Sequence, residues 1–146
     1  MSLLIKLERF CAYQERCTED VIKKMTSLKI PSTQHQILLK SLKESGFLNE
    51  ERFIESFING KLRQNKWGKQ KIKHALIQKK IQLPKIEDAL QKIDSEEYMA
   101  ILKSLYEKKL NSLTSEKNEF LKKQKAMHYL SSKGFYSTEI MELLGA

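Results

Sequence analysis

The chain has 146 residues and carries 27 Lys and Arg against 18 Asp and Glu, which gives a net charge of +9. It contains five glycines, two prolines and a single valine, against twenty leucines. Leucine loses little rotamer freedom in a helix, whereas valine and glycine disfavour one, so the composition predicts an all-α protein and excludes a β-sandwich or barrel. The excess of positive charge predicts a polyanionic or acidic partner.

The cysteines and histidines of the chain are few and scattered. Cys11 and Cys17 form no CxxC pair, and His35, His74 and His128 follow no zinc-ligand spacing. We therefore expect no metal or other cofactor, and we expect both thiols to be small core side chains. Charges interrupt the apolar run that a signal peptide needs, and no window of eighteen uncharged apolar residues exists. These features predict a reduced, cytoplasmic protein.

Apolar residues recur with the helical period along almost the whole chain, which predicts nine helices. Leu7 and Cys11 lie on one face of the first helix. Thr18, followed by two acids, predicts the N-terminal cap of a second helix that ends at Pro31. A third helix is expected over residues 32–44.

Capping residues mark the boundaries of the later helices. Asn49 is expected to cap a fourth helix and Gly68 a fifth, and Pro84 begins a short sixth. Asp94 and Glu97 have the spacing of a capping box at the start of a seventh helix. A long helix over residues 116–132 and a short one over residues 138–144 follow, with Gly134 between them.

The helices form a repeating pattern with three copies. The equivalent apolar positions are Val21, Ile72 and Ala126, then Met25, Leu76 and Leu130, then Ile30, Ile81 and Phe135, and in the last two copies also Ile86 with Ile140 and Leu90 with Leu144. Units this short cannot bury their apolar faces alone and must stack on one another. We expect three tandem three-helix repeats, at residues 1–47, 48–94 and 95–146, in an elongated, curved protein.

All of the excess positive charge lies in the middle of the chain. Residues 61–85 contain nine Lys or Arg and no acid, and the other residues carry 18 charges of each sign. A run of like charge is usually a solvated helix face, but such faces normally mix both signs. Lys69, Lys73 and Lys80 are expected within about 40° of one another on one side of a helix. We interpret this segment as a docking surface for a polyanion.

The candidate residues for binding a filament or phosphates are Arg63, Lys66, Trp67, Lys69, Lys71, Lys73, Lys79 and Lys80. Trp67 has two interpretations, since it can pack against Ile72 at the helix start or stack on a base. The backbone amides at Gly68 could contact an anion at the helix N-terminus. No phosphate-binding glycine loop, metal-binding HExxH pair or serine elbow occurs, so we expect no enzymatic activity.

The segment GFLNEERFIESFINGKLRQNKWGKQKIKHALIQKKI resembles the central signature of the RecX family, regulators of the RecA recombinase. The matching residues are Gly46, Leu48, Asn49, Glu50, Arg52, Phe53, Gly68, Lys71, Ile72, Leu76 and Ile81. Lys80 replaces the usual glycine before the isoleucine, where a left-handed helix end favours glycine. The C-terminal KQKAMHYLSSKGFYSTEI resembles the last family repeat, with its Lys-Gly-Phe turn at residues 133–135.

The resemblance implies a fold of tandem three-helix repeats and a role in DNA recombination, DNA repair and the SOS response. It implies binding in the groove of the RecA–DNA filament and suppression of ATP hydrolysis, strand exchange and coprotease activity. DNA phosphates could contribute through the basic central repeat, and the default state is a monomer. Two alternatives stay open, a sequence-independent DNA- or RNA-binding module and a helical adaptor for some other acidic protein.

Overall fold

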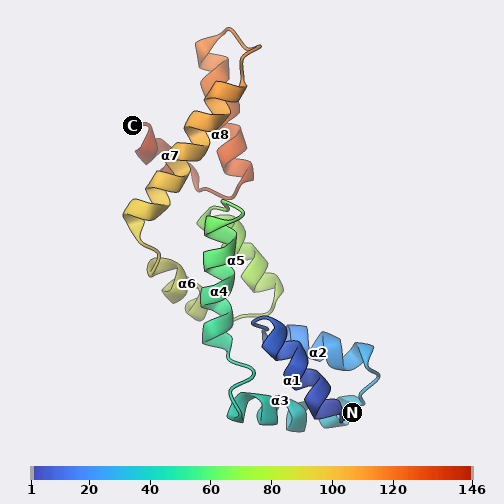
Figure 1. The fold of residues 1–146 in the computed structure, drawn as a ribbon. Coiled ribbons are helices and arrows are strands. Elements are labelled where there is room, and N and C mark those ends of the chain that lie inside the picture. The colour runs from blue at the N-terminus through green and yellow to red at the C-terminus, as the bar shows by residue number, and fades with distance from the viewer. Residues whose placement is uncertain (1, 146) are drawn as a thin grey trace. The chain divides into compact units, whose positions relative to one another are not determined.

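The computed structural model describes residues 2–145, which contain nine α-helices, one short 3₁₀ helix and no strand (Figure 1). The α-helices are α1 (Leu3–Tyr13), α2 (Thr18–Ser27), α3 (His35–Glu44), α4 (Glu50–Arg63), α5 (Lys69–Gln78), α6 (Leu83–Gln91), α7 (Ser95–Ser112), α8 (Glu119–Ser132) and α9 (Ser137–Leu143). The 3₁₀ helix η1 (Ser32–Gln34) leads into α3. The prediction of an all-α chain of three-helix units is confirmed.

The chain divides into two compact units, Met1–Phe57 and Ile58–Ala146, and α4 runs through the boundary. In the first unit α1, α2 and α3 pack around one apolar core. Leu7, Val21 and Leu42 are fully buried there. Cys11 and Cys17 are also buried, as predicted, and both are thiols outside any disulfide. Burial raises the pKa of the Cys11 thiol.

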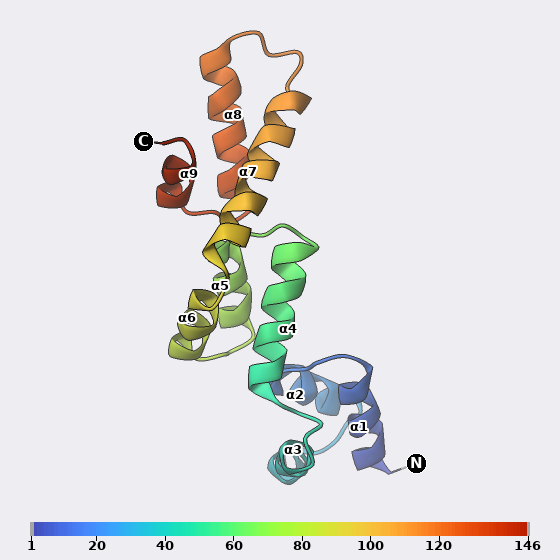
Figure 2. The ribbon, with the colours of Figure 1, turned by 60° about the vertical axis from the view of Figure 1, so that its left-hand side comes forward.

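The second unit contains two groups of packed helices. α5 packs on α6, while α7 and α8 lie side by side and α9 contacts both of them (Figure 2). The fully buried side chains include Ile72, Leu76, Ile86, Leu102 and Leu130. Each of these helices therefore turns one apolar stripe inward, as the helical period of the sequence predicts.

The three copies of the sequence repeat end their second helix in the same way. Lys29, Lys80 and Gly134 all have a positive φ, of 59°, 62° and 99°. The residue after each donates its N–H to the carbonyl five positions earlier: Ile30 to Met25, Ile81 to Leu76 and Phe135 to Leu130, at 3.0–3.2 Å. These are the backbone bonds of a Schellman helix end, with the apolar residue that follows turned into the core.

The aligned apolar positions are the buried ones. Val21, Ile72 and Ala126 have no exposed surface, and neither have Met25, Leu76 and Leu130. The alignment fails at its last position, because Leu90 is buried whereas Leu144 is 37% exposed. Leu144 is the C-terminal cap of the last helix.

Three predicted helix starts are wrong in detail. α2 is capped by Cys17 rather than Thr18, and the Asp20 carboxylate accepts a hydrogen bond from the Cys17 N–H. Asp94 does cap α7, but the Glu97 carboxylate binds Arg63 instead of closing a capping box. α8 begins at Glu119 and not at residue 116, because Asn118 provides the cap.

Lys80 is a non-glycine residue in a left-handed conformation, which costs free energy for any L-residue with a Cβ. Replacing Lys80 by glycine should therefore raise the free energy of unfolding by about 0.5–1 kcal/mol, measured by urea denaturation. The neighbouring Lys79 has a φ of −86°, so Lys79→Gly should give no gain. Equal effects of the two substitutions would contradict this explanation of the turn.

Candidate interaction surface

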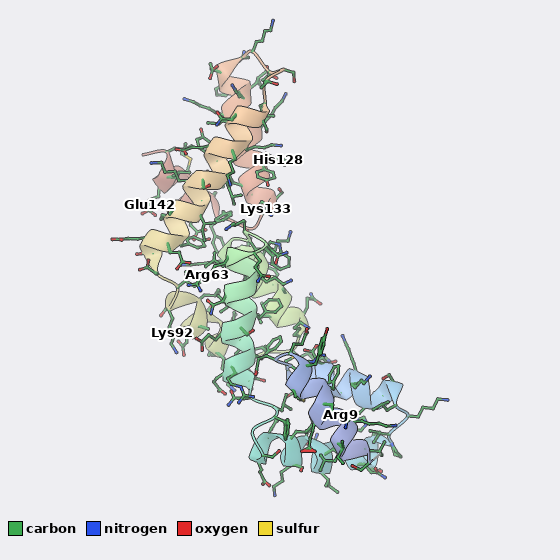
Figure 3. The ribbon with its side chains drawn as sticks, viewed as in Figure 1. Arg9, Arg63, Lys92, His128, Lys133 and Glu142 are labelled. Carbon is green, nitrogen blue, oxygen red and sulfur yellow. The ribbon has the colours of Figure 1, made fainter. Side chains whose placement is uncertain are left out.

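The predicted basic surface is spread over the end of α4, the turn after it, α5 and the start of α6. Figure 3 labels Arg63 at the end of α4 and Lys133 at the end of α8. Most of the predicted site residues are at least partly exposed, but several of their charged groups have partners within the second unit. The structure thus divides a run of nine basic residues into groups with different surroundings.

Arg63 forms a bidentate ion pair with Glu97 at the start of α7. Its Nε lies 2.7 Å from Oε1 and its Nη2 lies 3.2 Å from Oε2. These hydrogen bonds hold the pKa of the Glu97 carboxyl below its usual range and raise the pKa of Arg63. Arg63 therefore joins two helices of the second unit, and a ligand would have to compete with Glu97 for it.

The expected row of Lys69, Lys73 and Lys80 is not a uniform cationic face. The Lys69 Nζ lies 4.6 Å from the centre of the Tyr98 ring, and the Lys73 Nζ lies 3.3 Å from a Glu87 carboxylate oxygen. Helical spacing brings Lys69 and Lys73 to one side of α5. Lys69 has an internal partner on α7, and Lys73 has one on α6. The row therefore presents less accessible charge than its composition indicates.

A second group of cations surrounds Trp67. The Lys61 and Lys71 ammonium groups each lie 4.8 Å from the centre of the indole ring. Lys133 donates from its Nζ to the Asn65 carbonyl at 2.8 Å. Burial, with repulsion from Lys71, lowers the pKa of Lys133. Lysines of α4 and α5 thus share the Trp67 ring, and Lys133 at the end of α8 is bonded to the same turn through Asn65. We name Lys61, Trp67, Lys71 and Lys133 the tryptophan cluster.

Trp67 makes two cation–π contacts, and its packing against Ile72 stays a prediction. Its indole is half-buried and holds two ammonium groups by cation–π attraction, which brings like charges together. A base could stack on this ring only by displacing a lysine. The cluster is therefore better suited to binding an anion through its lysines than to binding a base through its indole.

The N-terminus of α5 is closed by backbone contacts with the turn between α8 and α9. The Gly68 N–H donates to the Lys133 carbonyl at 2.8 Å, and the Gln70 N–H donates to the Gly134 carbonyl at 2.9 Å. The Lys69 N–H donates to the Tyr98 hydroxyl at 3.0 Å. The expectation that these amides contact an anion is therefore wrong, because the third repeat already occupies them.

Two glycines permit this approach. A Cβ added to Gly68 would overlap the Gly134 carbonyl group, and one added to Gly134 would overlap the side chain and backbone nitrogen of Lys71. Gly134 also has a φ of 99°. The sequence marked both glycines as helix boundaries, but their meeting is a long-range contact that a helix pattern does not predict.

Tyr98 links the junction through its buried hydroxyl. The hydroxyl accepts from the Lys69 N–H and donates to Glu139 Oε1 at 2.8 Å, and that carboxylate also accepts from the Tyr136 N–H. The ring is 2% exposed and lies 5.4 Å from the Phe135 ring, centre to centre. Burial raises the pKa of Tyr98 far above its ordinary value, so the hydroxyl stays protonated and keeps donating.

Sequence reasoning missed Lys61, Tyr98 and Lys133 as residues of this surface. Lys61 belongs to the acid-free segment but was not singled out. Lys133 precedes the glycine of the Lys-Gly-Phe turn, which was the available signal for it. No sequence signal marks Tyr98, because its spacing along α7 is that of an ordinary core residue.

Two further properties of the described part bear on its chemistry. In residues 2–145, no three His, Cys, Asp or Glu side chains lie grouped as a metal ion would need. No helix of the same part combines the length and the apolar character needed to cross a bilayer.

Two family models match the chain. "RecX, second three-helix domain" matches residues 49–90, which are α4–α6, and "RecX, third three-helix domain" matches residues 96–144, which are α7–α9.

Curated relatives and solved structures agree with these matches. A "Regulatory protein RecX" of Clostridium perfringens (strain SM101 / Type A) is 38% identical over 98 residues, 66% of this chain and 45% of that protein. The protein of that name from Streptococcus agalactiae serotype III (strain NEM316) is 30% identical over 127 residues, 86% of this chain and 48% of that one. The chain thus spans about half the length of these relatives. The crystal structure of RecX from Lactobacillus salivarius has a TM-score of 0.86 at 23% identity, covering 97% of this chain and 92% of that one.

Tandem three-helix units with a basic middle segment place the chain among helical-repeat proteins. Both family models fall on those units, and together they match more than half of the residues. The chain belongs to the RecX family, whose curated members are named regulatory proteins.

Gly68→Ala should destabilise the second unit by about 2 kcal/mol or more, because the added methyl group would separate α5 from the Gly134 turn. Gly60→Ala is the matched control, since nothing lies within 4 Å of its added Cβ, and helix propensity predicts a gain of up to about 1 kcal/mol. Trp67 is the only tryptophan and adjoins this junction, so its fluorescence during urea unfolding reports both effects. Equal stability of the two variants would contradict this account of the junction.

Tyr98→Phe should lower the free energy of unfolding by about 1–3 kcal/mol, because the Lys69 N–H and the Glu139 carboxylate would each lose a partly buried hydrogen bond. Tyr106 on α7 is buried too, and burial alone raises its pKa, so Tyr106→Phe is the control and should change stability little. A Tyr98→Phe variant as stable as the parent would show that the hydroxyl bridge is dispensable.

Proposed function

We propose that this chain is a RecA regulator that binds RecA or the RecA–DNA filament and inhibits ATP hydrolysis, strand exchange and coprotease activity. The observation that carries the proposal is the match of two RecX domain models to α4–α9, which include the basic segment. On this proposal the chain is a non-enzymatic, cytoplasmic monomer that acts in recombination, DNA repair and the SOS response. We also propose residues 1–47, 48–94 and 95–146 as its three repeats.

The tryptophan cluster is the part of the second unit best suited to contact an acidic surface or phosphates. Its lysines come from three elements held by the closed junction, so their relative positions are fixed before binding. Bringing like charges together costs free energy, and that cost is recovered when an anion binds between them. Lys66, Lys79 and Lys80 extend the positive segment, while Lys69, Lys73 and Arg63 contribute after giving up internal partners.

Binding to a filament can inhibit ATP turnover without touching a catalytic group. A protein that contacts two neighbouring subunits binds more tightly to one of their relative arrangements, and it therefore opposes any step that changes that arrangement. Repeat proteins offer long contact surfaces of this kind. A few bound molecules can then affect a whole filament.

The test is a RecA ATPase assay on single-stranded DNA at substoichiometric amounts of this protein. Lys71→Glu should raise the concentration needed for half-inhibition by about fivefold to tenfold, since Lys71 is exposed and belongs to the tryptophan cluster. Lys103→Glu, on the exposed face of α7, makes the same change in net charge and should leave inhibition unaltered. Undiminished ATP hydrolysis with the parent protein would refute the proposal.

The rival function is a sequence-independent nucleic-acid module that only competes for DNA. Its supporting observation is the acid-free segment at residues 61–85. Such a module would inhibit in proportion to its affinity for free DNA, with a log–log salt slope of about −0.7 to −0.9 per phosphate. If Lys71→Glu weakened DNA binding and RecA inhibition equally, the rival would be favoured. Recovery of another acidic protein instead of RecA from a nuclease-treated lysate would favour a third role, as an adaptor.

A further inference from the structure

The first unit contains an open groove of about 370 Å³, which lies outside the basic segment at residues 61–85. Its lining residues are Lys6, Arg9, Phe10, Tyr13, Arg16, Lys24 and Leu28. Four of them lie on one face of α1, at positions i, i+3, i+4 and i+7. Lys24 on α2 and Leu28, the C-cap of α2, lie one turn apart. This face of α1 is distinct from the one that carries the buried Leu7 and Cys11.

The groove is strongly cationic although its unit carries both signs of charge. Four of its seven lining residues are Lys or Arg, and none is acidic. In the described residues no carboxylate forms an ion pair with Lys6 or Arg9. Two neighbouring acids have partners outside the groove, since Glu15 pairs with Arg52 and the Asp20 carboxylate accepts from the Cys17 N–H. The charged lining of the groove is therefore entirely positive.

Aromatic side chains alternate with these cations. The Arg16 guanidinium carbon lies 3.7 Å from the centre of the Phe10 ring, and its Nε donates to the Phe10 carbonyl at 3.0 Å. This bond holds the guanidinium over the ring. Tyr13, the last residue of α1, is 83% exposed, which is unusual for a large aromatic side chain. The groove thus offers two planar surfaces between positive charges.

We propose that this groove binds single-stranded nucleic acid, with an unpaired base stacked on Tyr13 or on the Arg16–Phe10 pair. Phosphates on either side of that base would contact Lys6, Arg9 and Lys24. Exposed aromatic rings and guanidinium planes beside a cationic track are the combination that single strands require. A duplex keeps its bases stacked inside the helix, so it could use the charges but not the rings.

An acidic protein segment is a less suitable occupant. It would need apolar anchoring surface, but the Phe10 ring is already covered by Arg16, and the Lys24 Nζ lies 5.4 Å from the same ring. The groove is also formed by helix faces, whose backbone groups are bonded within the helices and cannot pair with an extended peptide. The inference concerns the first repeat alone and does not depend on any action upon RecA.

The experiment measures fluorescence anisotropy of a labelled dT20 strand with the full chain, without RecA. Tyr13→Ala should weaken binding about tenfold, and Tyr13→Trp should restore it, because stacking and not the hydroxyl is required. Arg9→Ala should weaken binding and reduce the log–log salt slope by about 0.7. Arg9 is labelled on α1 in Figure 3. Lys40→Ala, on the exposed surface of α3, removes the same charge and should change binding less than twofold.

Several outcomes would overturn the proposal. Binding of dT20 that is insensitive to both Tyr13→Ala and Arg9→Ala would place any nucleic-acid contact elsewhere. A loss of binding in Lys71→Glu but not in the groove variants would place it on the tryptophan cluster. Binding of a 20-base-pair duplex or of poly-glutamate as tightly as dT20 would show that charge alone is recognised. Because RecA is absent, none of these outcomes decides whether the chain regulates RecA.

Discussion

The second unit depends on one close backbone contact, between Gly68 at the start of α5 and the Gly134 turn after α8. Neither position accommodates a Cβ, so the two segments can approach until backbone amides meet backbone carbonyls. The Tyr98 hydroxyl then accepts a hydrogen bond from a third amide, the N–H of Lys69. The contact joins the central and third repeats backbone to backbone, and it determines where the adjoining side chains lie. Trp67, Lys71 and Lys133 are each within one to three residues of these glycines.

The tryptophan cluster follows from that contact. Lys133 belongs to the third repeat, yet it reaches the Asn65 carbonyl in the turn before α5 because the two turns are in register. Two lysines then share one indole, and burial, with repulsion from Lys71, lowers the pKa of Lys133. Lysines that are distant along the chain therefore lie close together in space. A count over a sequence window finds nine basic residues but not this arrangement, since it includes Arg63, which Glu97 engages, and omits Lys133.

The sequence predicts the helices and their repeat because periodicity is a local property. Positions such as Val21, Ile72 and Ala126 are equivalent along the chain and equally buried in the structure. The candidate site was predicted less well, for two physical reasons. Partners such as Tyr98 and Glu87 come from other helices, and helical spacing does not reveal them. A charge count does not reveal the groove of the first unit, because Glu8, Glu15, Glu19 and Asp20 balance its four cations along the chain. In space, Glu15 and Asp20 bind groups outside the groove.

The three Schellman turns share one backbone conformation but have different surroundings. All three have a positive φ and the same pair of helix-ending hydrogen bonds, yet two are formed by lysine and one by glycine. Lys29 and Lys80 are exposed, so a side chain can be accommodated at both turns at a conformational cost. Gly134 lies against the Lys71 backbone, where any side chain would prevent the approach. Packing between repeats therefore requires glycine at the third turn. At the other two turns the left-handed conformation is the only constraint, and lysine can adopt it.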